Sequence, residues 1–319
     1  MFEDKYIELK RLKKNNKIGT IIIILIVILS FTWPFIIPYI SLNIFNYNIL
    51  NYIEDSSMNI ATAILVVVVV ALITTIYVKL CSPYNRLKSE LTNEVKNTIL
   101  NEEMNNFFNS TYKQEDSQEL SKILEKNKIG YNETIEVNDC FSATYNNIKF
   151  QYGDVRFYHY SDDDIVITFC GPIYVFDTKN AIEGDLYIGK KEKQLFGYRS
   201  VMDSFIDTKE NIEIKPSNNV LDDNISIRSK AHPNIIEDST FLDIIKEFMI
   251  SDKYTFIYKE NKLYVLNYNF EDSFEIEINN KEDEQKAKEH IVNNINAIKS
   301  DLDNIIRYRE RLNIKEDTF

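Results

Sequence analysis

Glycine and proline are scarce in this chain, which has only 7 Gly and 6 Pro among its 319 residues. Such a composition argues against collagen-like repeats and long flexible linkers. The phosphate-binding patterns G-x-x-x-x-G-K and G-x-G-x-x-G are both missing from the sequence. Gly171, which precedes Pro172, is therefore interpreted as a bulge or bend in a strand rather than as part of a phosphate loop.

Cysteine and histidine are also rare. The three cysteines are far apart and odd in number, so they indicate neither a disulfide framework nor a CxxC zinc or redox site, and a reducing compartment fits them best. The three histidines have no G-x-S-x-G or comparable nucleophile context, and each is interpreted as structural or exposed. These residues are Cys81, Cys140, Cys170, His159, His232 and His290.

Basic residues are outnumbered by acidic ones. The chain has 37 Lys and Arg against 49 Asp and Glu, a formal net charge of −12. Residues 1–78 hold 6 basic and 5 acidic residues, so the rest of the chain carries a net charge of −13. Nucleic acid and anionic lipid headgroups would repel such a segment. No nucleic-acid partner is expected.

Two long runs without charge lie in the first quarter of the sequence. Residues 18–40 read IGTIIIILIVILSFTWPFIIPYI, and residues 58–78 read MNIATAILVVVVVALITTIYV. As a helix, the first run would reach about 34 Å, which is enough to cross the hydrocarbon core of a bilayer. Two such runs in tandem predict a transmembrane hairpin over residues 18–78, in which Pro34 and Pro38 either kink the first span or end it.

The basic residues that flank the two runs give the hairpin an orientation. Residues 1–17 hold six Lys and Arg, the connection 41–57 holds none, and Lys79, Arg86 and Lys88 follow the second run. Basic residues are concentrated on the cytoplasmic side of membrane proteins. We therefore expect a multi-pass protein of the cell membrane, with a basic cytoplasmic N-terminus over residues 1–17 and a cytoplasmic C-terminus.

The sequence changes its period after the second run. Residues 79–128 are polar with apolar positions about four residues apart, which predicts an amphipathic helical region. Residues 129–319 begin with short β-branched and aromatic segments separated by turn residues, as in antiparallel strands, and continue with a helix over 237–250 and a hairpin over 254–268. The expected fold class is α+β: two transmembrane helices followed by a cytoplasmic domain with a mostly antiparallel sheet and long flanking helices.

The last part of the sequence predicts a long amphipathic helix. Its apolar stripe consists of Ala287, Ile291, Ile295, Ile298, Leu302 and Ile305. Because such a stripe is too apolar to remain in water, we expect the helix to dock on the rest of the domain, on residues 84–108 or on a second chain. A homo-oligomer is one of these three arrangements.

Residues 158–172, YHYSDDDIVITFCGP, contain three consecutive aspartates, Asp162 to Asp164, close to His159 and Cys170. A calcium loop would need ligands at alternating positions, a glycine and a distal glutamate, which this stretch lacks. The flanking segments are strand-like, and Ser161 to Asp164 suit a hairpin connection because Asp and Ser side chains hydrogen-bond their own backbone. The stretch is interpreted as a solvated turn rather than a metal site.

The order of the segments resembles a known family. Two N-terminal runs and a polar helix precede SDDDIVITFCGPIYVFD, with an F-x-G element at Phe169 to Gly171, and then come NNVLDDNISIRSKAHPNIIEDSTFLDIIKEFM and the hairpin LYVLNYNFEDSFE. This layout is similar to the bacterial membrane-protein family known as domain of unknown function 3137, over most of residues 130–312. The F-x-x-x-F of that family is replaced here by Leu221 to Ile225. The family has no established activity, so the resemblance implies an architecture and no catalytic residue.

Two hypotheses about function follow. The first is a membrane-anchored cytoplasmic module that binds a protein or a ligand without catalysis, with no cofactor, metal ligand or catalytic residue assigned. Its partners would be the membrane, crossed by two spans, and an unidentified protein. The alternative is a metal-dependent hydrolase that uses Asp162, Asp163, Asp164 and His159. The two hypotheses differ in whether those side chains converge in a concave pocket.

Overall fold

The computed structural model describes residues 2–44, 56–108, 117–161, 164–194, 197–200, 206–207, 209–216, 224–250, 254–268 and 274–316. The chain divides into two compact units. The helical unit comprises Met1–Lys96 and Ile276–Ala287, and the sheet unit comprises Asn97–Glu275 and Lys288–Phe319. Of the three boundaries between the units, those after Lys96 and after Ala287 fall inside helices and the one after Glu275 does not, whereas the sequence suggested a boundary near residue 128.

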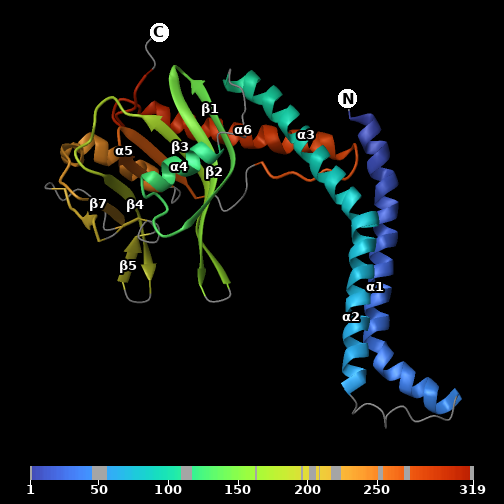
Figure 1. Ribbon diagram of the computed structural model, residues 1–319. Coiled ribbons are helices and arrows are strands. Elements are labelled where there is room, and N and C mark those ends of the chain that lie inside the picture. Colours follow the sequence, from blue (N-terminus) through green and yellow to red (C-terminus); the bar gives the residue numbers. More distant parts are fainter. Residues whose placement is uncertain are drawn as a thin grey trace. The chain divides into compact units, whose positions relative to one another are not determined.

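Long helices form most of the helical unit (Figure 1). They are α1 (Glu3–Ile44), α2 (Ser56–Ile76) and the first part of α3 (Ser82–Phe108), with the π-helical turn η2 (Tyr77–Cys81) joining α2 to α3. α1 continues past Pro34 and Pro38, so neither proline ends it. Figure 1 shows α1 turning aside before its C-terminal end, as expected where prolines remove backbone hydrogen bonds from a helix.

α1 packs antiparallel against η2, and Gly19 lies at the close approach. A Cβ on Gly19 would lie 2.8 Å from Cys81 Sγ and 2.9 Å from Leu80 Cβ. The Cys81 thiol lies 3.8 Å from the carbonyl oxygen of Asn16. Gly19 thus lets the two backbones come together, as small residues do between membrane helices. The π turn adds a residue to the helical repeat and so changes which face of the following α3 is turned toward α1.

Large apolar side chains on α1 and on the α2–η2 stretch are exposed. Leu29 is 60% exposed and Val67 is 67% exposed, and similar side chains lie at most described positions of 18–29 and 66–78. By length and composition, one described helical stretch, Val66–Phe108, could cross a membrane. Two spans are expected from the sequence, but the side chains of residues 33–40, in the first expected span, lie outside the described residues.

The beginning of α1 and the beginning of α3 hold the segment Ile276–Ala287 within the helical unit. Three polar contacts are Glu3 with Lys281 at 2.5 Å, Glu277 with Lys88, and the Ile278 N–H with Thr92 Oγ1 at 3.4 Å. Ile278 is fully buried. Exposed ion pairs contribute little free energy, so the pair of Glu3 and Lys281 stabilises this segment less than the burial of Ile278 does.

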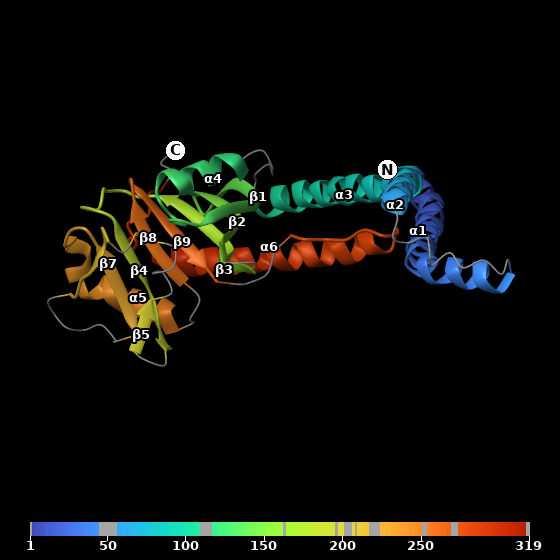
Figure 2. The same cartoon turned by 60° about the horizontal axis from the view of Figure 1, so that its bottom comes forward.

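The sheet unit is built on one antiparallel sheet (Figures 1 and 2). In the described part of the chain its strand order is β1-β2-β3-β9-β8-β4-β7-β6, and β5 pairs with β4. The strands are β1 (Thr134–Tyr145), β2 (Ile148–Ser161), β3 (Asp164–Asp177), β4 (Leu186–Gln194), β5 (Gly197–Ser200), β6 (Ile212–Glu213), β7 (Ile225–Ser229), β8 (Tyr254–Lys259) and β9 (Lys262–Asn267). The helices are α4 (Ser117–Lys126), α5 (Ser239–Ile250) after the 3-10 turn η5 (Asn234–Glu237), and α6 (Asp283–Arg307). The α+β class with an antiparallel sheet is confirmed.

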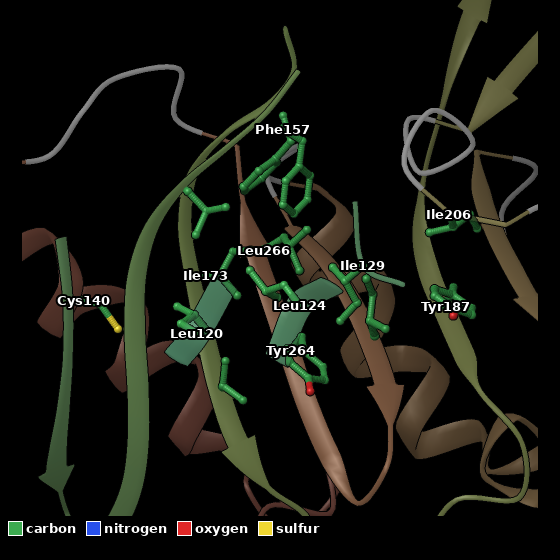
Figure 3. Packing of buried hydrophobic residues seen from close by; sticks show 14 residues of the cluster. Leu120, Leu124, Ile129, Cys140, Phe157, Ile173, Tyr187, Ile206, Tyr264 and Leu266 are labelled. Atoms are coloured by element: carbon green, nitrogen blue, oxygen red, sulfur yellow. The ribbon is translucent and has the colours of Figure 1, made fainter. Parts of the chain in front are cut away.

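One face of the sheet carries α4 and a largely aliphatic cluster (Figure 3). Leu120 and Leu124 of α4 are fully buried in a cluster with Ile173, Tyr264 and Leu266 of β3 and β9, and Figure 3 shows these side chains together. A Cβ on Gly153 of β2 would lie 2.2 Å from Leu120 Cδ2. The absence of a side chain at Gly153 therefore lets α4 lie close to the sheet.

The opposite face carries α5 and α6 over an aromatic layer. The strand register aligns Phe141, Tyr152 and Tyr174 across β1, β2 and β3, and all three are fully buried. Phe248 of α5 contacts Tyr254 of β8, with ring centroids 5.4 Å apart in an edge-to-face arrangement. Such pairs add to the free energy gained from burial of the rings alone.

α6 docks on this aromatic face, as its apolar stripe predicts. The stripe residues within the sheet unit, Ile291, Ile295, Ile298, Leu302 and Ile305, are each at most 3% exposed. Asp301 of α6 accepts hydrogen bonds from Tyr174 and Tyr254 of the sheet, and Lys288 pairs with Glu103 of α3 at 3.0 Å. Of the three partners expected from the sequence, two are therefore present: the sheet and the C-terminal part of α3.

Replacing Ile295 with Asp should unfold the sheet unit, because Ile295 is 0% exposed and a carboxylate there would be buried without a partner. We expect a loss of about 4 kcal/mol or more in the free energy of unfolding. Asn293→Asp adds the same charge at an exposed position of α6 and should change stability by no more than about 0.5 kcal/mol. Thermal unfolding of the detergent-solubilised chain, followed by circular dichroism, compares the two. Equal melting of both variants would mean that the stripe is not buried.

Candidate functional site

The aspartate stretch forms the end of the β2–β3 hairpin. Ser161 pairs with Asp164, and the antiparallel register continues from there to Phe150 and Phe176. The expected hairpin connection is thereby confirmed, because only two residues separate the paired ends of the strands. Asp164 is exposed, whereas Asp162 and Asp163 lie outside the described residues.

A bulge interrupts the same hairpin. Phe157 pairs with Phe169 and Tyr158 pairs with Ile167, so Thr168 is the extra residue in β3. Gly171 keeps its pairing with Val155 but adopts φ +149°, a backbone conformation that side chains disfavour. The bulge therefore lies three residues before Gly171, where the sequence suggested it. A glycine is needed at position 171 because of the positive φ at that position.

The three histidines each have a different local partner. His159 Nδ1 lies 3.1 Å from Glu133 Oε2, a carboxylate that is almost fully buried. His232 Nε2 lies 2.6 Å from Glu237 Oε1, and His290 Nε2 lies 3.1 Å from Asn294 Nδ2. In the described part of the chain, no group of three or more His, Cys, Asp or Glu side chains is placed to hold a metal. The hydrolase alternative stays a prediction, because Asp162 and Asp163 lie outside that part.

The end of the hairpin exposes large apolar side chains. Tyr160 is 70% exposed, Ile165 is 58% exposed and Ile167 is 47% exposed. Tyr160 pairs with Ile165 and Tyr158 pairs with Ile167, so the four side chains share one face of the two-stranded ribbon. Exposed apolar groups that are gathered in this way are typical of interaction surfaces.

Asp301, on α6, accepts hydrogen bonds from three strands. Tyr254 Oη donates to Oδ1 at 2.7 Å, and Tyr174 Oη and Asn267 Nδ2 donate to Oδ2 at 2.7 and 2.8 Å. Burial, followed by the charge of Asp301, raises the pKa of Tyr254 and of Tyr174 well above the usual range. These donors therefore contribute stability below about pH 10, the pKa of an unfolded tyrosine, and the contribution falls as the pH rises above that value.

Asp301 was not predicted from the sequence, because its partners lie on strands far away in the chain. One signal was present. Asp301 follows Ile298 by three residues and precedes Ile305 by four, so a carboxylate lies at the edge of a stripe that must be buried. A buried edge position needs hydrogen-bond donors, and the strands are rich in tyrosine.

A recess of about 320 Å³ lies beside Asp301, between the C-terminal halves of α5 and α6. Its lining includes the rings of Phe248, Tyr254 and Tyr308 and the charged groups of Glu247, Asp301 and Arg307. Tyr308 Oη donates to Glu247 Oε2 at 2.6 Å, and this hydrogen bond raises the pKa of Tyr308. The arrangement can hold a small group by aromatic contact and by charge.

Replacing Asp162, Asp163 and Asp164 together with Asn should leave the fold intact, because residues of an exposed turn change stability by about 0.5 kcal/mol or less each. Magnesium or manganese should not change the melting temperature of either the parent or the variant, since no metal site is expected. Differential scanning fluorimetry with and without each ion makes the comparison, with EDTA-treated parent as the control. A rise in melting temperature with metal that occurs in the parent and is lost in the variant would contradict the turn interpretation and favour the hydrolase.

Comparisons with protein-family models, with curated proteins and with solved structures find no match to this chain. The resemblance to domain of unknown function 3137 therefore stays a prediction.

Proposed function

We propose that this chain is a membrane-anchored module that binds a protein or a ligand on the cytoplasmic side of the cell membrane. The observation that carries the proposal is the exposed apolar surface of α1 and of the α2–η2 stretch. Exposure of such side chains to water is unfavourable by about 25 cal/mol per Å². A bilayer removes this cost, and it accepts helices because their backbone hydrogen bonds are satisfied internally.

The charge distribution supports two spans. No Asp, Glu, Lys or Arg occurs at residues 18–53 or 56–78, and each stretch exceeds the length that a helix needs to cross a bilayer. No ionisable side chain within these stretches marks an ion or proton pathway, so an anchor is a better explanation than transport. Membership of the family known as domain of unknown function 3137 is part of the same proposal and carries no activity with it.

The ends of the helices support the orientation. Lys5 of α1 pairs with Glu94 of α3, so the basic start of the chain lies beside the helix that leaves the second span. Basic residues favour the cytoplasmic side. The chain after residue 78 would then lie in the cytoplasm together with residues 1–17.

Binding rather than anchoring alone is supported by two surface features of the sheet unit. The hairpin end exposes Tyr160, Ile165 and Ile167, and the recess beside Asp301 combines aromatic rings with charged groups. Exposed apolar groups and concave aromatic recesses are both places where proteins hold partners or ligands.

Cysteine labelling in intact cells tests the orientation. Asn51→Cys introduces a thiol between the two spans, and Ser300→Cys introduces one at an exposed position of α6. A membrane-impermeant maleimide should label Cys introduced at 51 and not at 300. The parent is the control, because its three cysteines are buried. Labelling at 300 without labelling at 51 in intact cells would reverse the orientation. If the thiol at 300 stays unlabelled even after the cells are lysed, position 300 of α6 is not exposed as the structure describes.

A further inference from the structure

Three aromatic rings from three elements meet in the recess beside Asp301. Phe248 of α5 lies 5.4 Å from Tyr254 of β8 and 5.9 Å from Tyr308 after α6, measured between ring centroids, and both contacts are edge to face. In this arrangement the rings stand at steep angles to one another and wall a space of about 320 Å³. That volume is at the lower end of the range of small-ligand sites, which begins near roughly 300 Å³.

The recess carries two carboxylates without a cationic partner. Asp301 accepts hydrogen bonds only from neutral donors, and Glu247 accepts one from Tyr308. Among the residues that the structure describes, neither carboxylate forms an ion pair. Neutral donors orient a carboxylate but leave its charge in place, so the recess attracts positive charge.

Arg307 shows that a cation can already lie on one of these rings. Its guanidinium carbon lies 5.2 Å from the centroid of the Tyr308 ring, within the range of a cation–π contact. In the described residues Arg307 makes no ion pair with Glu247 or Asp301. The recess therefore has two negative charges against one positive charge, and the positive charge would compete with an incoming cation for the Tyr308 ring.

We propose that the recess binds an organic cation, meaning an ammonium or guanidinium group that carries alkyl substituents. The rings would contact the alkyl groups and the charge, and Glu247 and Asp301 would supply the counter-charge. An anion would be repelled by the two carboxylates, and a neutral apolar ligand would desolvate them without compensation. The cation can belong to a free small amine or to a lysine or arginine side chain of a partner protein, since both present the same group. The proposal rests on the binding role proposed above and not on the membrane anchor.

Isothermal titration calorimetry on the full chain in a non-ionic detergent tests the chemistry of the ligand. Choline is the cationic probe, and 3,3-dimethyl-1-butanol is its neutral counterpart of the same shape. Choline should bind, and the neutral alcohol should bind at least about ten-fold more weakly, because only the cation gains from the rings and the carboxylates. Equal binding of the two probes, or binding of neither choline nor a blocked lysine, would overturn the proposal.

Two surface substitutions should change the affinity for choline in opposite directions. Glu247→Gln should weaken binding by roughly two- to five-fold, because it removes an exposed counter-charge. Arg307→Gln should tighten binding by a similar factor, because it removes both a like charge and the competitor for Tyr308. Asp243→Asn on α5 and Lys299→Gln on α6 make the same charge changes at residues that do not line the recess and should have no effect. Changes in the same direction for the first pair, or equal effects in the control pair, would contradict binding in this recess.

The source of the cation is decided by a second ligand in the same titrations. Nα-acetyl-lysine N-methylamide represents a lysine side chain within a protein. Tighter binding of this compound than of choline would assign the recess to a partner protein, and tighter binding of choline would assign it to a small amine. Cysteine labelling in cells tests the membrane anchor separately. If the recess binds neither cation, the membrane proposal still stands, and if the labelling contradicts the anchor, the proposal for the recess still stands.

Discussion

The apolar faces of α1 and α2 impose the constraint on which the rest of the account depends. Side chains such as Leu29 and Val67 are more than half exposed, and few neighbouring residues of the helical unit cover them. A bilayer is the surrounding that makes such a surface stable. If α1 and α2 lie in the membrane, the polar start of α3 and the segment that ends in Ala287 must lie at its border. That segment is held there by burial of Ile278 rather than by the exposed pair of Glu3 and Lys281.

Within the sheet unit, α6 is held by a combination of apolar burial and one polar centre. The stripe that includes Ile295 supplies most of the free energy, since burial of each such side chain is worth roughly 1.5–3 kcal/mol. Asp301 adds geometric selectivity, because its carboxylate accepts hydrogen bonds from Tyr174, Tyr254 and Asn267 on three strands. A rotation or a one-turn shift of α6 would leave buried hydroxyls without an acceptor. The same carboxylate faces the recess, so the group that fixes the helix also sets the charge of the proposed ligand site.

Much of the architecture was predictable from local patterns, whereas the site was not. The stripe of α6 repeats with the helical period, and the β8–β9 hairpin, expected over residues 254–268, turns at Glu260–Asn261, which adopt positive φ as tight hairpin turns require. The bulge at Thr168 could not be placed, because it depends on which residue of β2 each residue of β3 faces. Asp301 was missed for the same reason: its partners are separated from it by up to 127 residues and are brought together only by the fold. The role of Gly19 could not be predicted either, because it depends on the close approach of Cys81, which lies on another helical segment.

The single tryptophan provides the most direct test of the membrane anchor. Trp33 lies in the first expected span, and no other tryptophan is present to obscure its fluorescence. The intact chain can be reconstituted into phosphatidylcholine vesicles whose acyl chains carry bromine, a short-range quencher, and compared with the same vesicles treated with aqueous iodide. The account predicts strong quenching of Trp33 by the brominated acyl chains and little quenching by iodide. Strong quenching by iodide together with none by the brominated lipid would place Trp33 in water and contradict the anchor.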